Sequence, residues 1–325
     1  MPGFTTHYIF GMKAYNDMPF TPLKHTIAKD RWLYQLGLQG PDMFFYNIPI
    51  LRHRDYRNVG SYMHEHKVNA FFECCLRRIG TIRSRQQQEE AISYLAGFMN
   101  HYIADSICHP YVYGRIGYPV DAPTSMHHGM HAHLENELDA ILLWKYKKKK
   151  PSEFNQTATI CLNGQEIQFI SHFLASCINE TYYPITYRNN FQVTPAMVHR
   201  SIWALRFGCR TLSDKNGKKK FGIAQVESIF VNHPVASAKM VTDSVTDYRS
   251  SCNLNHEAWS NPWDPTRVST ASFVDLFHET LDKCSRVYAL LNSAVTDNMP
   301  LDKQDLSPLL TELGNESYHS GLPVD

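Results

Sequence analysis

The sequence carries almost no net charge, because its 32 Lys and Arg are balanced by 31 Asp and Glu to a formal charge of +1. Without an excess of one sign, no long-range field attracts nucleic acid or an anionic membrane. The one basic run, KYKKKK at residues 145–150, is short, and we interpret it as the solvated end of a helix, with a lipid-surface contact as the alternative. We therefore expect no nucleic-acid partner, and any contact with a membrane surface to be transient.

Paired cysteines and long apolar runs are also missing. None of the eight cysteines belongs to a C-x-x-C pair, and Cys74 and Cys75 are adjacent, which argues against a disulfide framework. No stretch of about eighteen apolar residues occurs, and the N-terminal MPGFTTHYIFGMKAY lacks a basic segment followed by an apolar one. We expect a soluble, cytoplasmic protein with no signal peptide and no transmembrane segment, and no feature of the sequence specifies an oligomeric state.

Helical periodicity dominates what is present. A chain of 325 residues with 43% hydrophobic content can bury a large core. The segment QQEEAISYLAGFMNHYIADSI places apolar side chains at helical spacing, namely Ile92, Leu95, Phe98, Met99 and Tyr102. HKVNAFFECCLRRI and HAHLENELDAILLWKYKK show the same pattern. The sequence therefore predicts an all-α protein, a multi-helix bundle.

One segment interrupts the helical pattern. In ATICLNGQEIQF an Asn-Gly pair stands between two short alternating runs, which predicts a small β-hairpin insertion near residues 157–170. We expect a helical core at residues 1–150 that carries the candidate ligands, and a second helical part at residues 151–300 that packs on it. Residues 301–325 are polar with Pro and Gly, and we expect a loosely ordered tail.

A helical segment near residue 105 carries too many metal-competent side chains for an ordinary core. NHYIADSICHPY places His101, Asp105 and His109 four residues apart, so they share one helix face with Cβ atoms roughly 6 Å apart. A lone His with an Asp one turn later is usually a satisfied polar pair. A third member in the same register favours a row of metal ligands instead.

Further candidate ligands precede this row and follow it. His7 lies in TTHYIFG, Asp42 in LGLQGPDMFFY, and SYMHEHK offers His64 or His66. In HHGMHAHLENELD the pair is either His131 with Glu135 or His133 with Glu137, and because the two pairs lie about 200° apart around one helix, only one can face the site. One member from each cluster gives eight candidates: His7, Asp42, His64, His101, Asp105, His109, His131 and Glu135.

Imidazole and carboxylate without thiolate suit Zn²⁺ with an open position, and Fe or Mn less well. Eight ligands exceed the three or four that one zinc needs. The sequence therefore predicts a multinuclear zinc site in which a carboxylate such as Asp105 bridges two ions.

In chain order these motifs read T-H, G-P-D, M-H-E, G-F-x-x-H-x-x-x-D-x-x-x-H-P, and H-x-x-x-E followed by an Asp. The sequence thereby resembles the zinc-dependent phospholipase C family, all-helical trinuclear-zinc phosphodiesterases that share their architecture with zinc-dependent single-strand nucleases. The resemblance covers residues 4–145 well, and NPWDPTRVSTASF only loosely. It favours His64 over His66, and His131 with Glu135 over His133 with Glu137.

The resemblance implies two to three zinc ions. The first ion would be held by Asp42, His64, His101 and Asp105. The second ion would be held by Asp105 and His7, and the third by His109, His131 and Glu135. Secreted members complete the second site with their processed N-terminal residue, and Pro2, after removal of Met1, would be the counterpart here. Met43 stands where phosphatidylcholine-cleaving members carry a tyrosine, so the resemblance does not extend to choline specificity.

The implied chemistry is hydrolysis of a phospholipid or small phosphoester by zinc-activated water, with Asp42 both ligand and acceptor of the proton. A single-strand nuclease-like phosphodiesterase is the first alternative, against which the near-zero charge argues. A non-catalytic metal-binding or scaffold protein is the second. A ferritin-like carboxylate bundle would need paired E-x-x-H motifs, and the one present, Glu316 to His319, lies in the tail.

Aromatic residues accompany the ligand-rich segments, namely Phe44, Phe45, Tyr46, Tyr102 and Tyr111. We interpret them as packing residues, with a lipid pocket as the alternative. Trp259 and Trp263 in EAWSNPWDP are interpreted as core or loop anchors without a role in the site.

Overall fold

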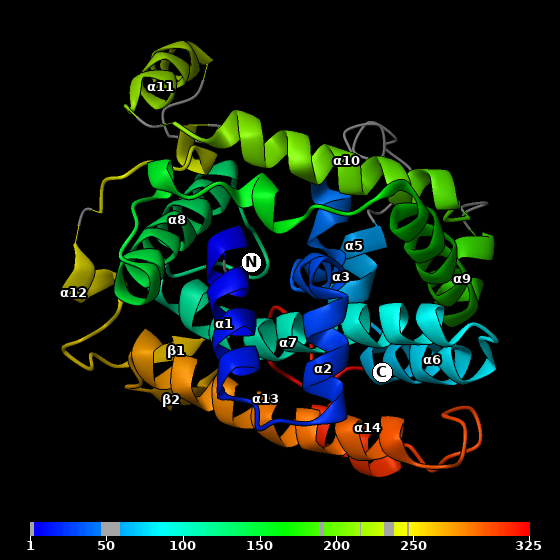
Figure 1. Ribbon diagram of the computed structural model, residues 1–325. Helices are drawn as coiled ribbons and strands as arrows, with labels where there is room; N and C mark the ends of the chain where they lie inside the picture. Colours follow the sequence, from blue (N-terminus) through cyan, green and yellow to red (C-terminus); the bar gives the residue numbers. More distant parts are fainter. Residues whose placement is uncertain (1–2, 47–58, 189–191, 215, 231–236, 246) are drawn as a thin grey trace.

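The computed structural model describes residues 3–46, 59–188, 192–214, 216–230, 237–245 and 247–325 (Figure 1). The prediction of a mostly helical bundle is confirmed. The elements are α1 (Phe4–Asp17), α2 (Pro22–Lys29), α3 (Arg31–Gly37), the 3₁₀ helix η1 (Gly40–Tyr46), α5 (Val59–Glu65), α6 (Val68–Thr81), α7 (Arg85–Arg115), α8 (Ser125–Lys147), η2 (Pro151–Glu153), η3 (Gln156–Thr159), α9 (Gly164–Arg188), α10 (Pro195–Leu212), α11 (Lys218–Phe230), η4 (Ser237–Lys239), α12 (Tyr248–Ser251), β1 (Trp259–Asn261), β2 (Asp264–Ser269), α13 (Phe273–Thr296) and α14 (Ser307–Leu313).

Helix α7 runs through the middle of the molecule, with α1, α3, α6 and α13 around it (Figure 1). It begins after Ser84, whose hydroxyl accepts a hydrogen bond from the backbone N–H of Gln87, as an N-cap residue should. From residue 90 to residue 112 nearly every side chain is buried, polar ones included. A helix enclosed on all faces must satisfy or pair each polar group it carries, which directs attention to the His and Asp residues in its centre.

Two glycines let α3 and α7 approach closely. A Cβ atom on Gly37 would lie 2.1 Å from the carbonyl oxygen of Tyr94, and one on Gly97 would lie 2.1 Å from that of Tyr34. Gly40, at the start of η1, has φ +46° and faces the ring of His101, which a Cβ would meet at 2.2 Å. Glycine is therefore required to bring the G-P-D motif against the central helix.

The predicted hairpin near residues 157–170 is wrong in its position. These residues form η3 and the start of α9, because Asn163 caps that helix: its side-chain oxygen accepts from the backbone N–H groups of Gln165 and Glu166, both at 2.9 Å. The Glu166 carboxylate in turn accepts from the N–H of Asn163 at 2.6 Å, a reciprocal cap. The one small sheet among the described residues pairs β1 and β2 antiparallel.

The predicted loosely ordered tail at residues 301–325 is also wrong. Leu309, Leu310 and Leu313 of α14 are buried in the larger hydrophobic core, and so is Tyr318. This core includes side chains from Ala14 to Tyr318. The expected division of the chain into a core at residues 1–150 and a second helical part at residues 151–300 stays a prediction. The polar composition was misleading, because a few apolar anchors and hydrogen bonds to distant backbone suffice to order the segment.

All eight cysteines are unpaired, as expected for a sequence without a disulfide framework. None of the described helices is long and apolar enough to span a bilayer.

Two buried tyrosines of α7 provide a test of how the tail is held. The Tyr102 hydroxyl donates to Glu316 Oε2 at 2.6 Å and accepts from the Glu316 N–H at 2.9 Å, whereas the Tyr94 hydroxyl has no partner among the described residues. Tyr102→Phe should lower the free energy of unfolding by about 1–3 kcal/mol, because it leaves buried groups of the tail unpaired. Tyr94→Phe, the matched control, should change it by less than about 1 kcal/mol, because only an unpaired hydroxyl is removed. Equal losses for the two variants in chemical denaturation would contradict this account of the tail.

Candidate metal centre

Two groups of His, Asp and Glu side chains meet in the interior. The ligand atoms of Asp42, His64, His101 and Asp105 all lie within 4.8 Å of one another, and those of His109, His131 and Glu135 do the same. Three of these seven side chains come from α7, two from α8, and one each from η1 and α5. The described residues thus bring together seven of the eight predicted ligands in two adjacent groups.

The first group is arranged around paired carboxylates. His64 Nε2 lies 3.2 Å from Asp42 Oδ1 and 3.7 Å from Asp105 Oδ2. His101 Nε2 lies 3.2 Å from Asp105 Oδ2 and 3.8 Å from Asp42 Oδ1. Two imidazole nitrogens and two carboxylate oxygens therefore surround one small volume, a donor set of four such as zinc takes.

The eighth predicted ligand, His7, lies on the other side of Asp105. Its Nε2 is 3.1 Å from Asp105 Oδ1, and its ring stacks on that of His101 with centroids 4.0 Å apart. The same oxygen lies 3.7 Å from Nδ1 of His109. One oxygen of Asp105 therefore faces His64 and His101, and the other faces His7 and His109, so that the two oxygens could be shared between two bound cations. The N-terminal ligand expected from Pro2 falls outside the described residues.

The second group fixes which face of α8 points inward. His131 Nε2 lies 2.6 Å from Glu135 Oε1, and His109 Nε2 lies 3.6 Å from the same oxygen. His133 is 48% exposed and lies on the outer face beside Glu137, whose carboxylate accepts a hydrogen bond from Ser251. His133 and Glu137 therefore lie outside both groups.

Three of the candidate ligand histidines, His64, His101 and His109, share one pattern of hydrogen bonding. The Nδ1–H of His64 donates to the carbonyl of Gly60 at 2.6 Å, and that of His101 donates to Leu38 at 3.1 Å. His109 Nδ1 donates to the carbonyl of Tyr318 at 2.7 Å. With the proton fixed on Nδ1, each Nε2 presents a lone pair to the interior, as in histidines that bind a metal.

These inward atoms fit a bound cation because they have no other partner. Several ligand atoms are buried without a hydrogen bond among the described residues, namely Asp42 Oδ1, both oxygens of Asp105, both ring nitrogens of His7, and Nε2 of His64, His101 and His109. Leaving so many buried acceptors facing one another costs about 1–3 kcal/mol for each. Nitrogen and oxygen donors without sulfur match zinc, and a cation would satisfy them together.

Burial also sets the protonation states. It lowers the pKa of His109 and of His131 well below the usual range, which favours the neutral form of each ring, the form that binds a metal. Burial opposes ionisation of Asp105, but the facing rings of His109, His101 and His7 outweigh it and hold its pKa well below the usual value. Burial raises the pKa of Glu135 well above its usual range. A neighbouring cation would lower this pKa again, because it stabilises the carboxylate.

Asp139, the acidic residue that follows the H-x-x-x-E motif, holds the N-terminus of α1. Its carboxylate accepts from the backbone N–H of Thr5 at 3.1 Å and of Thr6 at 2.7 Å, where the helix dipole also favours a negative charge. His7 is the next residue along the chain. Asp139 therefore positions a candidate ligand, a role that its spacing did not indicate.

One histidine beside the two groups, His319 in the C-terminal segment, is not among the ligands predicted from the sequence. Its ring stacks on that of His64, with centroids 4.9 Å apart and planes inclined by 14°. The available signal was the E-x-x-H motif of Glu316 and His319, which we weigh only as evidence for a ferritin-like bundle, where it fails because it is unpaired and lies in the tail.

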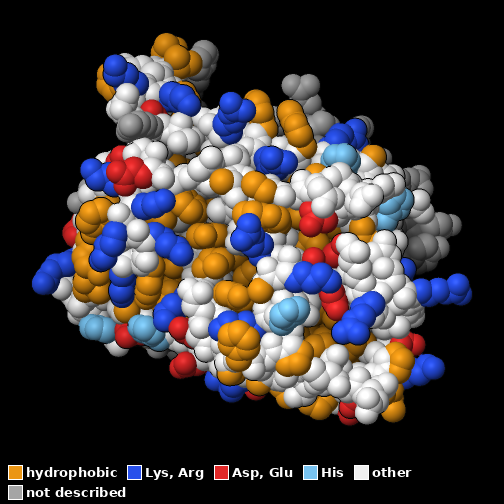
Figure 2. Space-filling model, viewed as in Figure 1, with side chains coloured by type: hydrophobic (Ala, Val, Ile, Leu, Met, Phe, Trp, Pro, Cys, Tyr) orange, Lys and Arg blue, Asp and Glu red, His pale blue; other side chains and the backbone are white. Residues whose placement is uncertain are grey.

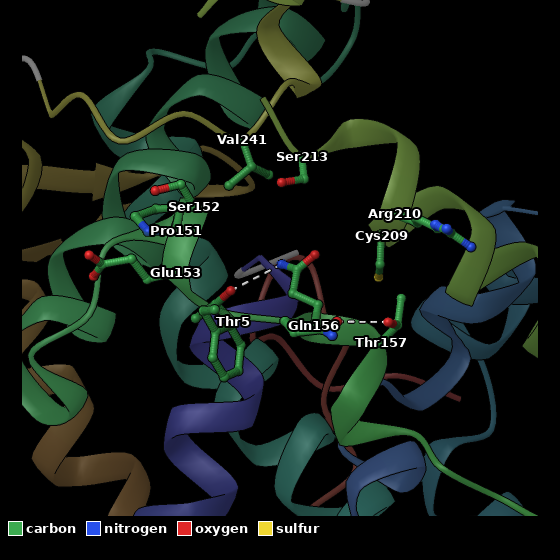
Figure 3. Close-up of a pocket in the computed structure, with 12 residues that line it drawn as sticks. Thr5, Pro151, Ser152, Glu153, Gln156, Thr157, Cys209, Arg210, Ser213 and Val241 are labelled. Carbon is green, nitrogen blue, oxygen red and sulfur yellow. Dashed lines mark hydrogen bonds between the residues drawn. The ribbon is translucent and has the colours of Figure 1, made fainter. Parts of the chain in front are cut away.

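A polar cavity of about 430 Å³ lies beside the start of α1 (Figure 3). Thr5 and Gln156 point toward each other across it, and Gln156 Nε2 donates to the Thr5 hydroxyl at 3.1 Å (Figure 3). Since Thr5 is two residues from His7, this hydrogen bond adds to the support of the α1 terminus.

One comparison with known proteins gives a match. A model of the zinc-dependent phospholipase C family matches residues 6–186, which include all eight predicted ligands. No curated protein and no solved structure matches the chain.

The inward face of α8 can be tested with two histidines two residues apart. Dialysed wild-type protein should retain about two to three zinc equivalents by elemental analysis. His131→Ala should lose at least one of them, because it removes one of three ligands of the second group, whereas His133→Ala should retain all. A site emptied by His133→Ala and not by His131→Ala would mean that Glu137 replaces Glu135.

The shared carboxylate gives a second test. Asp105→Asn keeps the size of the side chain but removes the charge that faces both sides, so at least one zinc should be lost on dialysis. Asp30→Asn replaces another buried carboxylate, which lies at the end of α2, and should keep all of the zinc. Full zinc retention by Asp105→Asn would mean that Asp105 does not bridge two ions.

Proposed function

The chain belongs to the zinc-dependent phospholipase C family, and on that basis we propose that it is a phospholipase C-like hydrolase of phosphoric esters. The main support for this proposal is the arrangement around Asp105. Each of its two carboxylate oxygens lies within 3.7 Å of ring nitrogens from a separate pair of histidines. We assign zinc to both groups, with Asp105 and His7 as ligands of a further ion between them. Such a cluster suits a phosphoester, because it can act on several oxygens of one phosphoryl group.

Zinc bound there would make a coordinated water acidic enough to attack at neutral pH, and would offset the negative charge that builds on the phosphoryl oxygens. The chain itself supplies the proton acceptor, which we assign to Asp42. Its Oδ1 faces His64 and His101, which leaves the second carboxylate oxygen to take the proton of the attacking water. Gly40 and the close contact of α3 with α7 hold this carboxylate in place.

An apolar cavity beside the second group supports an amphiphilic substrate. It has a volume of about 600 Å³ and extends from Glu135 and Asn136 on α8 to Trp203 and Phe207 on α10. The rings of Trp203 and Phe207 stack, with centroids 5.3 Å apart and planes inclined by 8°, and both are more than half exposed. An exposed aromatic pair at the mouth of an apolar cavity is suited to acyl chains.

The surface around this mouth combines apolar and basic side chains. Arg200 and Lys239 line the same cavity as the aromatic pair, and Figure 2 shows hydrophobic and basic side chains next to one another along the edge formed by α10. This combination supports a transient contact with a phospholipid surface. Of the aromatics near the ligand motifs, Phe44, Tyr102 and Tyr111 are buried packing residues, whereas Phe45 and Tyr46 line the cavity.

A substrate panel tests the proposal. Zinc-loaded protein should hydrolyse bis-p-nitrophenyl phosphate and vesicles of phosphatidylcholine or phosphatidylethanolamine faster than short single-stranded DNA, because the cavity is apolar and a strand-binding groove would need a row of basic side chains. Asp105→Asn is the inactive control. Salt-sensitive cleavage of DNA without phospholipid turnover would assign the protein to the nuclease alternative. No turnover of any substrate by fully loaded protein would indicate a non-catalytic metal-binding protein.

A further inference from the structure

The C-terminal segment crosses both ligand groups of the metal centre. The backbone N–H of Tyr318 donates to the carbonyl of His64 at 2.9 Å, and the carbonyl of Tyr318 accepts from His109 Nδ1 at 2.7 Å. These two histidines belong to different groups. The family match ends at residue 186, so it assigns no role to this segment.

The side chain of His319 covers the two groups together. Its ring stacks on that of His64, as described above, and lies 5.6 Å from that of His109, centroid to centroid. His319 is partly exposed, whereas His64 and His109 are fully buried. Of these three residues, His319 is therefore the one that keeps exposed surface.

The two ring nitrogens of His319 are in different environments. Nδ1 lies 3.2 Å from the hydroxyl of Tyr113, whereas Nε2 has no hydrogen-bond partner among the described residues. A tyrosine hydroxyl carries its proton at neutral pH and can donate it to Nδ1; in that tautomer the imidazole proton is on Nε2. Nε2–H is then a free donor beside the ligand groups. His319 belongs to neither group of mutually close ligand atoms, so its geometry is that of an outer contact and not of a metal ligand.

The backbone around His319 is held by its own hydrogen bonds. The N–H of His319 donates to the Ser317 hydroxyl at 3.1 Å, and Gly321, with φ +61°, closes the turn by donating to the carbonyl of Ser317 at 3.0 Å. Asn261, at the end of β1, donates from its side chain to the carbonyl of Ser320 at 2.7 Å. The position of His319 is therefore fixed before a substrate binds, as a contact residue requires.

We propose that His319 is a substrate-contacting residue whose Nε2–H donates a hydrogen bond to a phosphoryl oxygen bound across the two ligand groups. This inference rests on the function proposed above and adds to it a specific residue from the other end of the chain. The hydrogen bond joins a neutral donor to a charged acceptor, the stronger class of hydrogen bond.

Binding of inorganic phosphate tests the contact without requiring turnover. By calorimetry on zinc-loaded full-length protein, His319→Ala should weaken phosphate binding about tenfold or more, the loss expected for a hydrogen bond to a charged group. His319→Gln keeps an N–H donor on a side chain of similar reach and should bind within about threefold of wild type. His319→Phe keeps a ring to stack on His64 but has no N–H, and should behave like the alanine variant.

Zinc content and a control histidine complete the design. All three variants should retain the zinc of the wild type by elemental analysis, and His133→Ala, on the outer face of α8, should leave phosphate affinity unchanged. Wild-type affinity in both His319→Ala and His319→Phe would overturn the inference, as would a wild type that binds no phosphate. Loss of zinc from His319→Ala would also overturn the inference, because it would mean that His319 is itself a metal ligand.

The outcomes separate this inference from the proposed function. Phosphate binding that depends on His319, without hydrolysis of any ester, would leave the contact intact and remove the hydrolase. Hydrolysis that is unaffected in all three variants would leave the proposed hydrolase activity intact and overturn the contact of His319 with substrate.

Discussion

The buried carboxylate of Asp105 is the group on which the rest of the structure depends. It is fully enclosed in the middle of α7, and imidazole nitrogens from α1, α5 and α7 itself lie within 3.7 Å of its two oxygens. A charge in such a place is stable only when opposite charge is close by. The helices that surround it, and both ends of the chain, bring ligands or supports to this one position.

That convergence would couple metal binding to folding. His7 is held near Asp105 because Asp139 on α8 fixes the start of α1, and His109 is oriented by a carbonyl from the C-terminal segment. Segments separated by more than one hundred residues therefore meet around the same candidate metal site. Because the candidate ligands are assembled only in the folded chain, a bound metal would contribute directly to the free energy of folding.

The sequence predicts the centre better than it predicts the surroundings. The four-residue spacing on α7 and the motif order were enough to select the eight ligand candidates, because spacing along a helix determines which side chains share a face. The hairpin near residue 160 was misplaced because Asn-Gly suits a turn and also caps a helix, and only the later Glu166 distinguishes the two. The tail and His319 were missed because their order depends on partners such as Tyr102, which is 214 residues away from Glu316. Local composition carries no record of such contacts.

The central claim is that buried nitrogen and oxygen ligands around Asp105 hold zinc, and X-ray absorption at the zinc edge tests it most directly. For dialysed wild-type protein the account predicts nitrogen and oxygen neighbours at about 2.0–2.1 Å, with the multiple-scattering signature of imidazole and no sulfur shell. A sulfur shell at about 2.3 Å would place the zinc at cysteines instead, and protein that is folded yet retains no zinc would contradict the account altogether.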